Sequence, residues 1–137
     1  MELREATIHD LHVLTKMNIQ LRADEKMDNQ MTDDEVEQRM KGFLEGESYT
    51  AYILKSTDTV YGYALIDKTK KPIYLRQLFV EKPFRNKGLG REVIQKIMET
   101  LSVKEIDVDV MAWNEQALNF YEKFGFKRRY IGLRYKE

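Results

Sequence analysis

The stretch IYLRQLFVEKPFRNKGLGREVIQKIMETL, residues 73–101, carries the clearest change of pattern in the chain. Apolar residues alternate along 73–80 with the period of a β-strand, and Pro83 closes the strand. We expect one face of this strand to carry Ile73, Leu75, Gln77 and Phe79. Beyond the loop at 85–90 the period becomes helical, and one apolar stripe is formed by Leu89, Val93, Ile97 and Leu101. The stretch therefore predicts a strand, a glycine-containing loop and a helix.

The sequence before this stretch predicts two helices and three short strands. Thr7 or Asp10 caps the first helix, whose apolar residues are Leu11, Leu14, Met17 and Leu21. A capping box at Thr32–Glu35 begins the second helix, and Gly46 ends it. The strands are expected at 3–6, 49–54 and 61–65.

The sequence after this stretch predicts a strand, a helix and one or two further strands. The strand alternates at Ile106, Val108 and Val110. Asn114 caps the helix and Gly125 ends it, and residues 126–135 alternate loosely as one or two final strands. The resulting order, β-α-α-β-β-β-α-β-α-β(-β), predicts one mixed three-layer α/β domain over residues 1–137.

The composition excludes several classes of protein. The 137 residues are 42% hydrophobic and 34% charged, and the 23 basic and 23 acidic residues cancel. This is a globular balance with no net charge to favour nucleic acid, and no apolar run is long enough to span a membrane. The absence of cysteine excludes a disulfide scaffold and a thiol nucleophile, and His9 and His12 lack the partners of a metal site. We expect a cytoplasmic protein with no metal and no nucleic-acid or membrane partner.

The loop at 85–90, RNKGLG, has the chemistry of an anion site. It opens a helix, whose N-terminus exposes unpaired amides and a partial positive charge. Its glycines let a phosphate approach those amides closely, and Arg85, Lys87 and Arg91 add local positive charge. The alternative is a glycine turn with a solvated basic rim. The spacing is neither that of a Walker loop nor that of a dinucleotide fingerprint.

A second patterned segment, WNEQALNFYEKFGF, spans residues 113–126 and predicts an N-capped amphipathic helix. Taken alone, Asn114 is a helix cap and Tyr121 is a half-buried core residue. The Arg-x-x-Gly-x-Gly loop and the Asn-x-x-Ala-x-x-Phe-Tyr-x-x-x-Gly-Phe run are more specific as a pair. Together they resemble two consecutive motifs of the GNAT family of N-acetyltransferases, over about residues 73–126.

The resemblance implies a GNAT-like fold, a mixed and mostly antiparallel sheet flanked by helices, and an acetyl-CoA-dependent N-acetyltransferase. It implies that Asn114 bonds the pantetheine arm and that Tyr121 protonates the departing thiolate. Backbone groups for the pantetheine and the thioester are implied around Leu78, Phe79 and Val80. The pyrophosphate is implied to bind the backbone amides of Arg85, Asn86, Lys87, Gly88, Leu89 and Gly90.

The general base is left open by the sequence. Some relatives carry an acidic residue five positions before the motif asparagine, and here that residue is Asp109. The alternatives are that Asp107 and Asp109 form the polar face of an edge strand, and that water accepts the proton.

The acceptor is also left open. Acidic residues crowd the link between the first two helices, which suits a cationic amine or is simply a solvated surface. We expect direct transfer of the acetyl group to a primary amine, with a small molecule favoured over a protein N-terminus. The alternative function is a non-catalytic acyl-CoA-binding regulatory module. A homodimer through the aromatic-rich residues 130–135 fits the resemblance.

Overall fold

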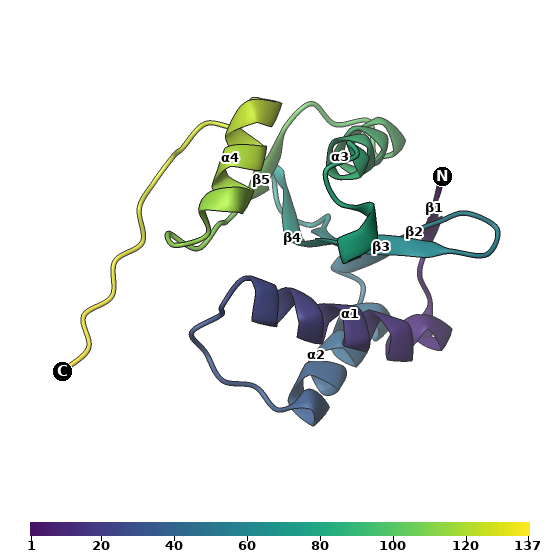
Figure 1. Ribbon diagram of the computed structural model, residues 1–137, viewed down its shortest axis with the longest axis horizontal. Helices are drawn as coiled ribbons and strands as arrows, with labels where there is room; N and C mark the ends of the chain where they lie inside the picture. Colours follow the sequence, from purple (N-terminus) through teal and green to yellow (C-terminus); the bar gives the residue numbers. More distant parts are fainter.

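The structure, a computed structural model, describes residues 1–137 as a five-stranded sheet with helices on both faces (Figure 1). The strands lie in the order β1-β2-β3-β4-β5 and pair antiparallel, except that β4 and β5 are parallel. The strands are β1 (Glu2–Glu5), β2 (Tyr49–Lys55), β3 (Val60–Asp67), β4 (Ile73–Val80) and β5 (Ile106–Val108). The helices are α1 (Leu11–Asp24), α2 (Asp33–Glu45), α3 (Leu89–Thr100) and α4 (Glu115–Phe124). The expected fold class is confirmed.

Two apolar clusters lie on opposite faces of the sheet. Side chains alternate along a strand, so β2 and β3 supply both clusters. The cluster shared with α3 and α4 includes Tyr52, Leu54, Ala64, Ile66, Leu75, Val93, Ile94, Ile97 and Tyr121. The cluster shared with α1 and α2 includes Leu14, Met17, Leu21, Met40, Ala51, Ile53, Tyr63, Leu65 and Phe79. The sheet is therefore the middle of three layers.

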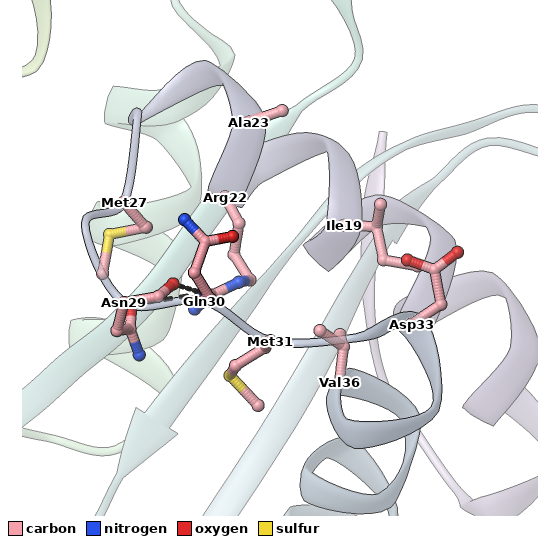
Figure 2. Close-up of a pocket in the computed structure, with 9 residues that line it drawn as sticks. All are labelled: Ile19, Arg22, Ala23, Met27, Asn29, Gln30, Met31, Asp33 and Val36. Atoms are coloured by element: carbon pink, nitrogen blue, oxygen red, sulfur yellow. Dashed lines mark hydrogen bonds between the residues drawn. The ribbon is translucent and has the colours of Figure 1, made fainter.

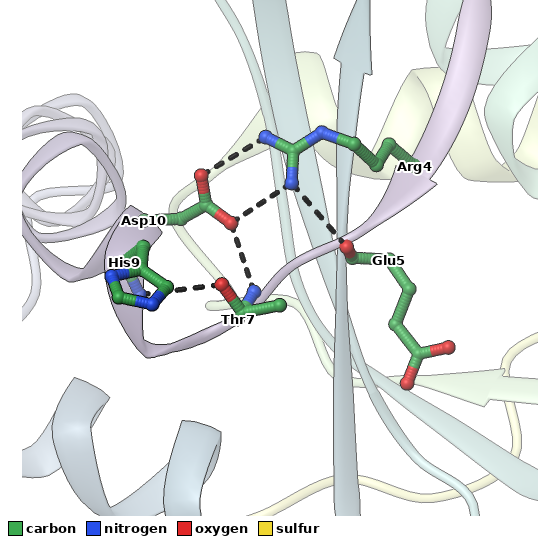
Figure 3. Close-up of polar contacts among 5 residues, drawn as sticks. All are labelled: Arg4, Glu5, Thr7, His9 and Asp10. Carbon is green, nitrogen blue, oxygen red and sulfur yellow. Dashed lines mark hydrogen bonds and ion pairs between the residues drawn. The ribbon is translucent and has the colours of Figure 1, made fainter.

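Two capping boxes fix where α1 and α2 begin. Thr7 caps a short 3₁₀ turn that runs into α1, and its amide donates to Asp10 at 2.8 Å (Figure 3). Arg4 on β1 donates to both oxygens of Asp10, at 3.1 and 2.9 Å, and these bonds outweigh partial burial to lower the pKa of Asp10. Thr32 and Glu35 form the second capping box, as predicted. None of these helices is both long and apolar enough to cross a membrane.

A β-bulge at Arg76 changes which side chains of β4 face which layer. Residues 65 and 66 of β3 pair with Gln77 and Leu75 respectively, so Arg76 is the inserted residue. Leu75 packs in the cluster under α3, whereas Phe79 packs under α1 and α2. The expectation that alternate residues of β4 share one face along its whole length is therefore wrong, because an inserted residue reverses the alternation.

Residues 126–137 form no strand, and the expectation of one or two final strands is wrong. The segment leaves α4 in extended form and runs away from the core (Figure 1). The Phe126 amide donates to the Tyr121 carbonyl at 3.0 Å, and beyond it the hydrogen bonds come from side chains: Tyr130 donates to Asp109 at 2.7 Å, and Arg134 donates to Asp28 at 3.4 Å. An alternating segment becomes a strand only where it exchanges ladder hydrogen bonds with a neighbouring edge. The free edge of β5 meets this segment through side chains alone, since Arg129 pairs with Asp107 at 3.6 Å and no backbone bonds join the two.

Gly62 on β3 should be hard to replace. A Cβ at Gly62 would lie 1.9 Å from the carbonyl oxygen of Phe79, and a paired backbone cannot move aside as a flexible side chain does. We expect Gly62→Ala to lower the free energy of unfolding by at least about 1–3 kcal/mol.

Gly42→Ala in α2 is the matched control for Gly62→Ala. A Cβ at Gly42 meets nothing within 4 Å. Alanine inside a helix stabilises it by about 0.5–1 kcal/mol relative to glycine, so the control should unfold at higher urea. Equal urea midpoints for the two variants would contradict the close approach of β3 and β4.

Candidate functional site

Strands β4 and β5 pair over a short length and then part. Residues 73–75 pair with 106–108, and β5 ends at Val108 and not at Val110 as expected. β4 continues to Val80 and stays paired with β3 on its other side. The edge of β4 that faces β5 is therefore open from Arg76 to Val80. The predicted residues Leu78, Phe79 and Val80 lie on this open edge, where backbone groups are available to a ligand.

The loop that follows β4 gathers free backbone donors. The amides of residues 86–91 donate to no group in the protein, and the first bond of α3 runs from the Glu92 amide to the Gly88 carbonyl at 3.1 Å. Asn86 and Gly88 have φ values of +62° and +81°, a left-handed conformation that recurs in anion-binding nests. Lys87 is exposed beside them. The loop therefore offers the free backbone donors that an anion site needs, and its role as a pyrophosphate site stays a prediction.

Close packing joins this loop to α4. A Cβ at Gly90 would lie 2.9 Å from Cζ of Phe120, so glycine at this position lets the Phe120 ring of α4 pack closely against the start of α3. The Arg91 guanidinium lies 4.5 Å from the ring centre of Phe124 and donates to the Lys123 carbonyl at 3.3 Å. Part of the positive charge that the sequence assigned to the loop is thus used to dock α4.

Arg85 joins the loop to α1. Its Nε donates to the Val80 carbonyl at 2.7 Å, and its guanidinium donates to Asp24 at 2.7 Å. Burial of Asp24 is outweighed by these hydrogen bonds and by nearby positive charge, so the pKa of Asp24 lies below its ordinary value. The Arg85 side chain therefore fixes the end of α1 beside the open edge of β4. Its backbone amide, predicted to be an anion donor, instead donates to the Lys82 carbonyl at 3.3 Å, so that part of the prediction is wrong.

The two predicted residues of α4 differ in their surroundings. Asn114 begins the helix, and its Oδ1 accepts from the Ala117 amide at 3.2 Å, which leaves its NH₂ group free to donate. Tyr121 is only 9% exposed, with edge-to-face rings of Phe120 and Phe126 at 5.0 and 5.2 Å. Burial, followed by the charge of Glu25, raises the pKa of Tyr121 above the ordinary tyrosine value. The hydroxyl therefore keeps its proton at neutral pH.

Asp109 lies just after β5, and both of its oxygens hold donors. Tyr74 donates to Oδ2 at 3.1 Å and Tyr130 donates to Oδ1 at 2.7 Å. The role of Asp109 as a base stays a prediction.

A buried polar chain was not predicted from the sequence. Tyr63, which is 0% exposed, donates to Oε1 of Gln77 on β4 at 2.8 Å and accepts from Asn18 at 3.0 Å. Arg39 on α2 donates to Asn18 at 3.0 Å and completes the chain. The one signal in the sequence was an asparagine among the apolar residues of α1. The chain connects both helices of this layer to β4 beside its bulge.

The acetyltransferase (GNAT) domain family matches residues 8–134, nearly the whole chain. The chain belongs to the GNAT acetyltransferase family. It is an N-acetyltransferase, as the two sequence motifs at 85–90 and 113–126 implied, and its relatives include enzymes of this kind. The alternative of a non-catalytic acyl-CoA-binding module is therefore not favoured.

Three known proteins illustrate the relationship. The chain is 26% identical over 139 residues to thialysine N-epsilon-acetyltransferase of Mus musculus, covering 90% of this chain and 82% of that protein. It is 28% identical over 94 residues to the ribosomal protein bS18 alanine N-acetyltransferase of Salmonella typhimurium, covering 66% and 64%. The aminoglycoside N-acetyltransferase AAC(6')-Iy, solved in complex with CoA, superposes with a TM-score of 0.76 at 16% identity over 99% and 93% of the two chains. The last likeness shows the GNAT fold.

This GNAT enzyme also has a cavity of about 170 Å³ between the end of α1 and the start of α2 (Figure 2). Arg22 and Asp33 are the charged residues that line it, and Arg22 donates to the Asn29 carbonyl at 2.6 Å. None of the residues predicted for the GNAT site lines this cavity. It is therefore separate from the opening beside β4.

The Arg85–Asp24 ion pair should contribute measurably to stability. Both side chains are about one-third exposed, at 30% and 32%, so we expect a coupling free energy of about 0.5–1 kcal/mol in a double-mutant cycle of Arg85→Gln and Asp24→Asn. The more exposed Arg128–Glu122 pair, at 68% and 40%, is the control and should couple less. Urea unfolding of each cycle measures both couplings. A coupling for Arg85–Asp24 no larger than that of the control would contradict its role in fixing α1.

Proposed function

We propose that this enzyme moves an acetyl group from acetyl-CoA to a primary amine of a small molecule, by direct attack through a tetrahedral intermediate. The observation that carries the proposal is the cluster of unpaired amides at 86–91 beside the open edge of β4. A pyrophosphate suits the amides, and an extended pantetheine arm suits an open strand edge. The structural neighbour that holds CoA supports the choice of donor.

Each residue of the site has a chemical task in this proposal. The amides of 86–91 hold the pyrophosphate, and the free NH₂ of Asn114 donates to the pantetheine. Backbone N–H groups on the open edge around Leu78 and Phe79 stabilise the oxyanion of the tetrahedral intermediate. Tyr121 gives its proton to the sulfur as the carbon–sulfur bond breaks, which a buried, protonated hydroxyl is suited to do. The amine must lose a proton before it attacks, and the sequence nominates Asp109 or water to accept it.

A small-molecule amine is the favoured acceptor. The sequence match to the thialysine enzyme covers 90% of this chain, whereas the match to the enzyme named for a ribosomal protein covers 66%. A panel of thialysine, ornithine and spermine, with a peptide that begins with alanine as the protein-like arm, would identify the class by release of free CoA thiol. Transfer to the peptide alone would replace the small-molecule proposal with a protein acceptor.

A homodimer and a cytoplasmic location stay predictions of the sequence. The extended residues 126–137 give the dimer a structural basis, because Ile131 and Leu133 are 84% and 92% exposed. Burying such side chains against a second copy would remove apolar surface from water. Light scattering of the intact chain and of a chain ending at Gly125 would test the dimer.

Acetyl-CoA should raise the melting temperature of the wild type. Ligand at a hundredfold excess over Kd stabilises a protein by about 2.7 kcal/mol. Gly88→Asp should abolish this shift, since it places a carboxylate among the amides that hold the pyrophosphate. Gly88→Asn is the matched control, because asparagine has the same shape and also tolerates the φ of +81° without adding charge. An unchanged shift in Gly88→Asp would show that the loop is only a turn.

Tyr121→Phe should lower kcat by about 10²–10⁴-fold with little change in the Kd of acetyl-CoA. The ring keeps its contacts with Phe120 and Phe126, so only the proton donor is lost. Tyr52→Phe is the control, since Tyr52 is 7% exposed in the same apolar cluster but lies on β2. Full kcat in Tyr121→Phe, on an amine that the wild type acetylates, would remove Tyr121 from the mechanism.

A further inference from the structure

Glu25, the residue that follows α1, is a half-buried carboxylate without a partner. Its side chain takes part in no ion pair or hydrogen bond, although its neighbour Asp24 is paired with Arg85. Burial raises the pKa of Glu25, and the charge of Asp24 adds to this while Arg22 opposes it. A carboxylate that is partly removed from water and left unpaired destabilises the fold, so its position calls for a functional reason.

The charge of Glu25 acts on two buried tyrosines that belong to different elements. It raises the pKa of Tyr121 on α4, where it is the first influence after burial. It also raises the pKa of Tyr63 on β3, whose hydroxyl is bonded to Gln77 beside the bulge of β4. From α2, Arg39 acts on the same Tyr63 in the opposite direction. The charge of Glu25 therefore acts both on the proposed proton donor and on a buried tyrosine of the layer formed by α1 and α2.

Two contacts hold Glu25 in this place. Nε1 of Trp113, just before α4, donates to the Glu25 carbonyl at 3.0 Å. Arg85 holds the adjacent Asp24 at 2.7 Å and the Val80 carbonyl at 2.7 Å. The end of α1 is thus fastened both to the segment that begins α4 and to the end of β4. These are the two sides of the opening where β4 and β5 part.

We propose that Glu25 is the catalytic base that takes the proton from the ammonium group of the acceptor amine. This rests on the proposed function, and it names an acceptor that arrives as a cation. An unpaired, half-buried carboxylate beside this opening attracts an ammonium group strongly, because few waters compete with the ion pair. Asp109 is less available for this task, since Tyr74 and Tyr130 donate to its two oxygens.

The protons and bonds balance in this scheme. The ammonium group gives one proton to Glu25, and the free amine forms a carbon–nitrogen bond with the thioester carbonyl carbon. The intermediate then loses a second proton from nitrogen to water, the carbon–sulfur bond breaks, and Tyr121 protonates the sulfur. The proton released to water restores Tyr121, and Glu25 returns its own proton to solvent. The products are the amide, CoA thiol and one proton in solution.

The experiment is the pH profile of kcat/KM for Glu25→Gln and the wild type, with the fastest amine of the panel as acceptor. The wild type should be flat between the pKa of Glu25 and that of the amine, because it uses the ammonium form. Without a base the variant uses only free amine, so its kcat/KM should rise about tenfold per pH unit. At pH 7 the loss should be about 10²–10⁴-fold. Glu45→Gln, at the exposed end of α2, is the matched control and should follow the wild type.

Stability supplies a second measurement that does not depend on activity. The raised pKa means that the fold favours protonated Glu25, so this residue contributes stability below its unfolded pKa and loses it as pH rises through the folded pKa. Glu25→Gln should therefore melt higher than the wild type at pH 7–8, and the difference should shrink as pH falls. A variant that loses both activity and melting temperature would make Glu25 a structural residue and overturn the proposal.

The outcomes separate this proposal from the function on which it rests. No acetyl transfer by the wild type to any amine would overturn the proposed function itself. An active wild type whose pH profile is matched by Glu25→Gln would overturn the role of Glu25 alone. If Asp109→Asn showed the tenfold rise per pH unit and Glu25→Gln did not, the base would be Asp109. If Glu25→Gln raised only KM and kept the pH profile of the wild type, Glu25 would bind the acceptor without acting as a base, and the proposal would be overturned.

Discussion

The parting of β4 and β5 after three paired residues is the constraint on which the rest of the site depends. Strands in a sheet normally satisfy each other's backbone groups, and an unpaired edge inside a domain is costly unless a ligand or water uses it. Here the open edge runs from the bulge at Arg76 to Val80, directly before the loop with unpaired amides. The backbone, more than any side chain, thus shapes the place where an acyl donor would lie.

A chain with equal numbers of acidic and basic residues has no general field to draw in an anion. The structure instead gathers unpaired backbone amides at the N-terminus of α3, where an anion can be bound without an excess of lysine and arginine. Arg85 and Arg91 are used to bind Asp24 and to dock α4, respectively. Their charges therefore assemble the opening, while the uncharged amides and the exposed Lys87 remain free for the proposed pyrophosphate.

Burial gives the ionisable groups around this opening different properties. The Tyr121 hydroxyl is kept protonated because its anion would be buried near Glu25. The Glu25 carboxylate is unpaired, although an ion pair with an arginine would stabilise it. Asp24, one residue earlier, has such a partner in Arg85. Stability and activity place opposite demands on a group such as Glu25, which is common where a site needs a desolvated charge.

The sequence by itself determined the order of elements as far as α4. It also determined the two capping boxes, the loop at 85–90 and the helix that Asn114 caps and that carries Tyr121, because these follow from local periodicity and local hydrogen bonding. It did not determine the faces of β4, since a bulge depends on pairing with β3. Nor did it determine residues 126–137, which alternate but form no ladder hydrogen bonds with the edge of β5. The buried chain from Arg39 to Gln77 and the isolation of Glu25 were decided only by the tertiary structure. Burial and partners far apart in sequence set the pKa and the availability of a side chain, and no local pattern records them.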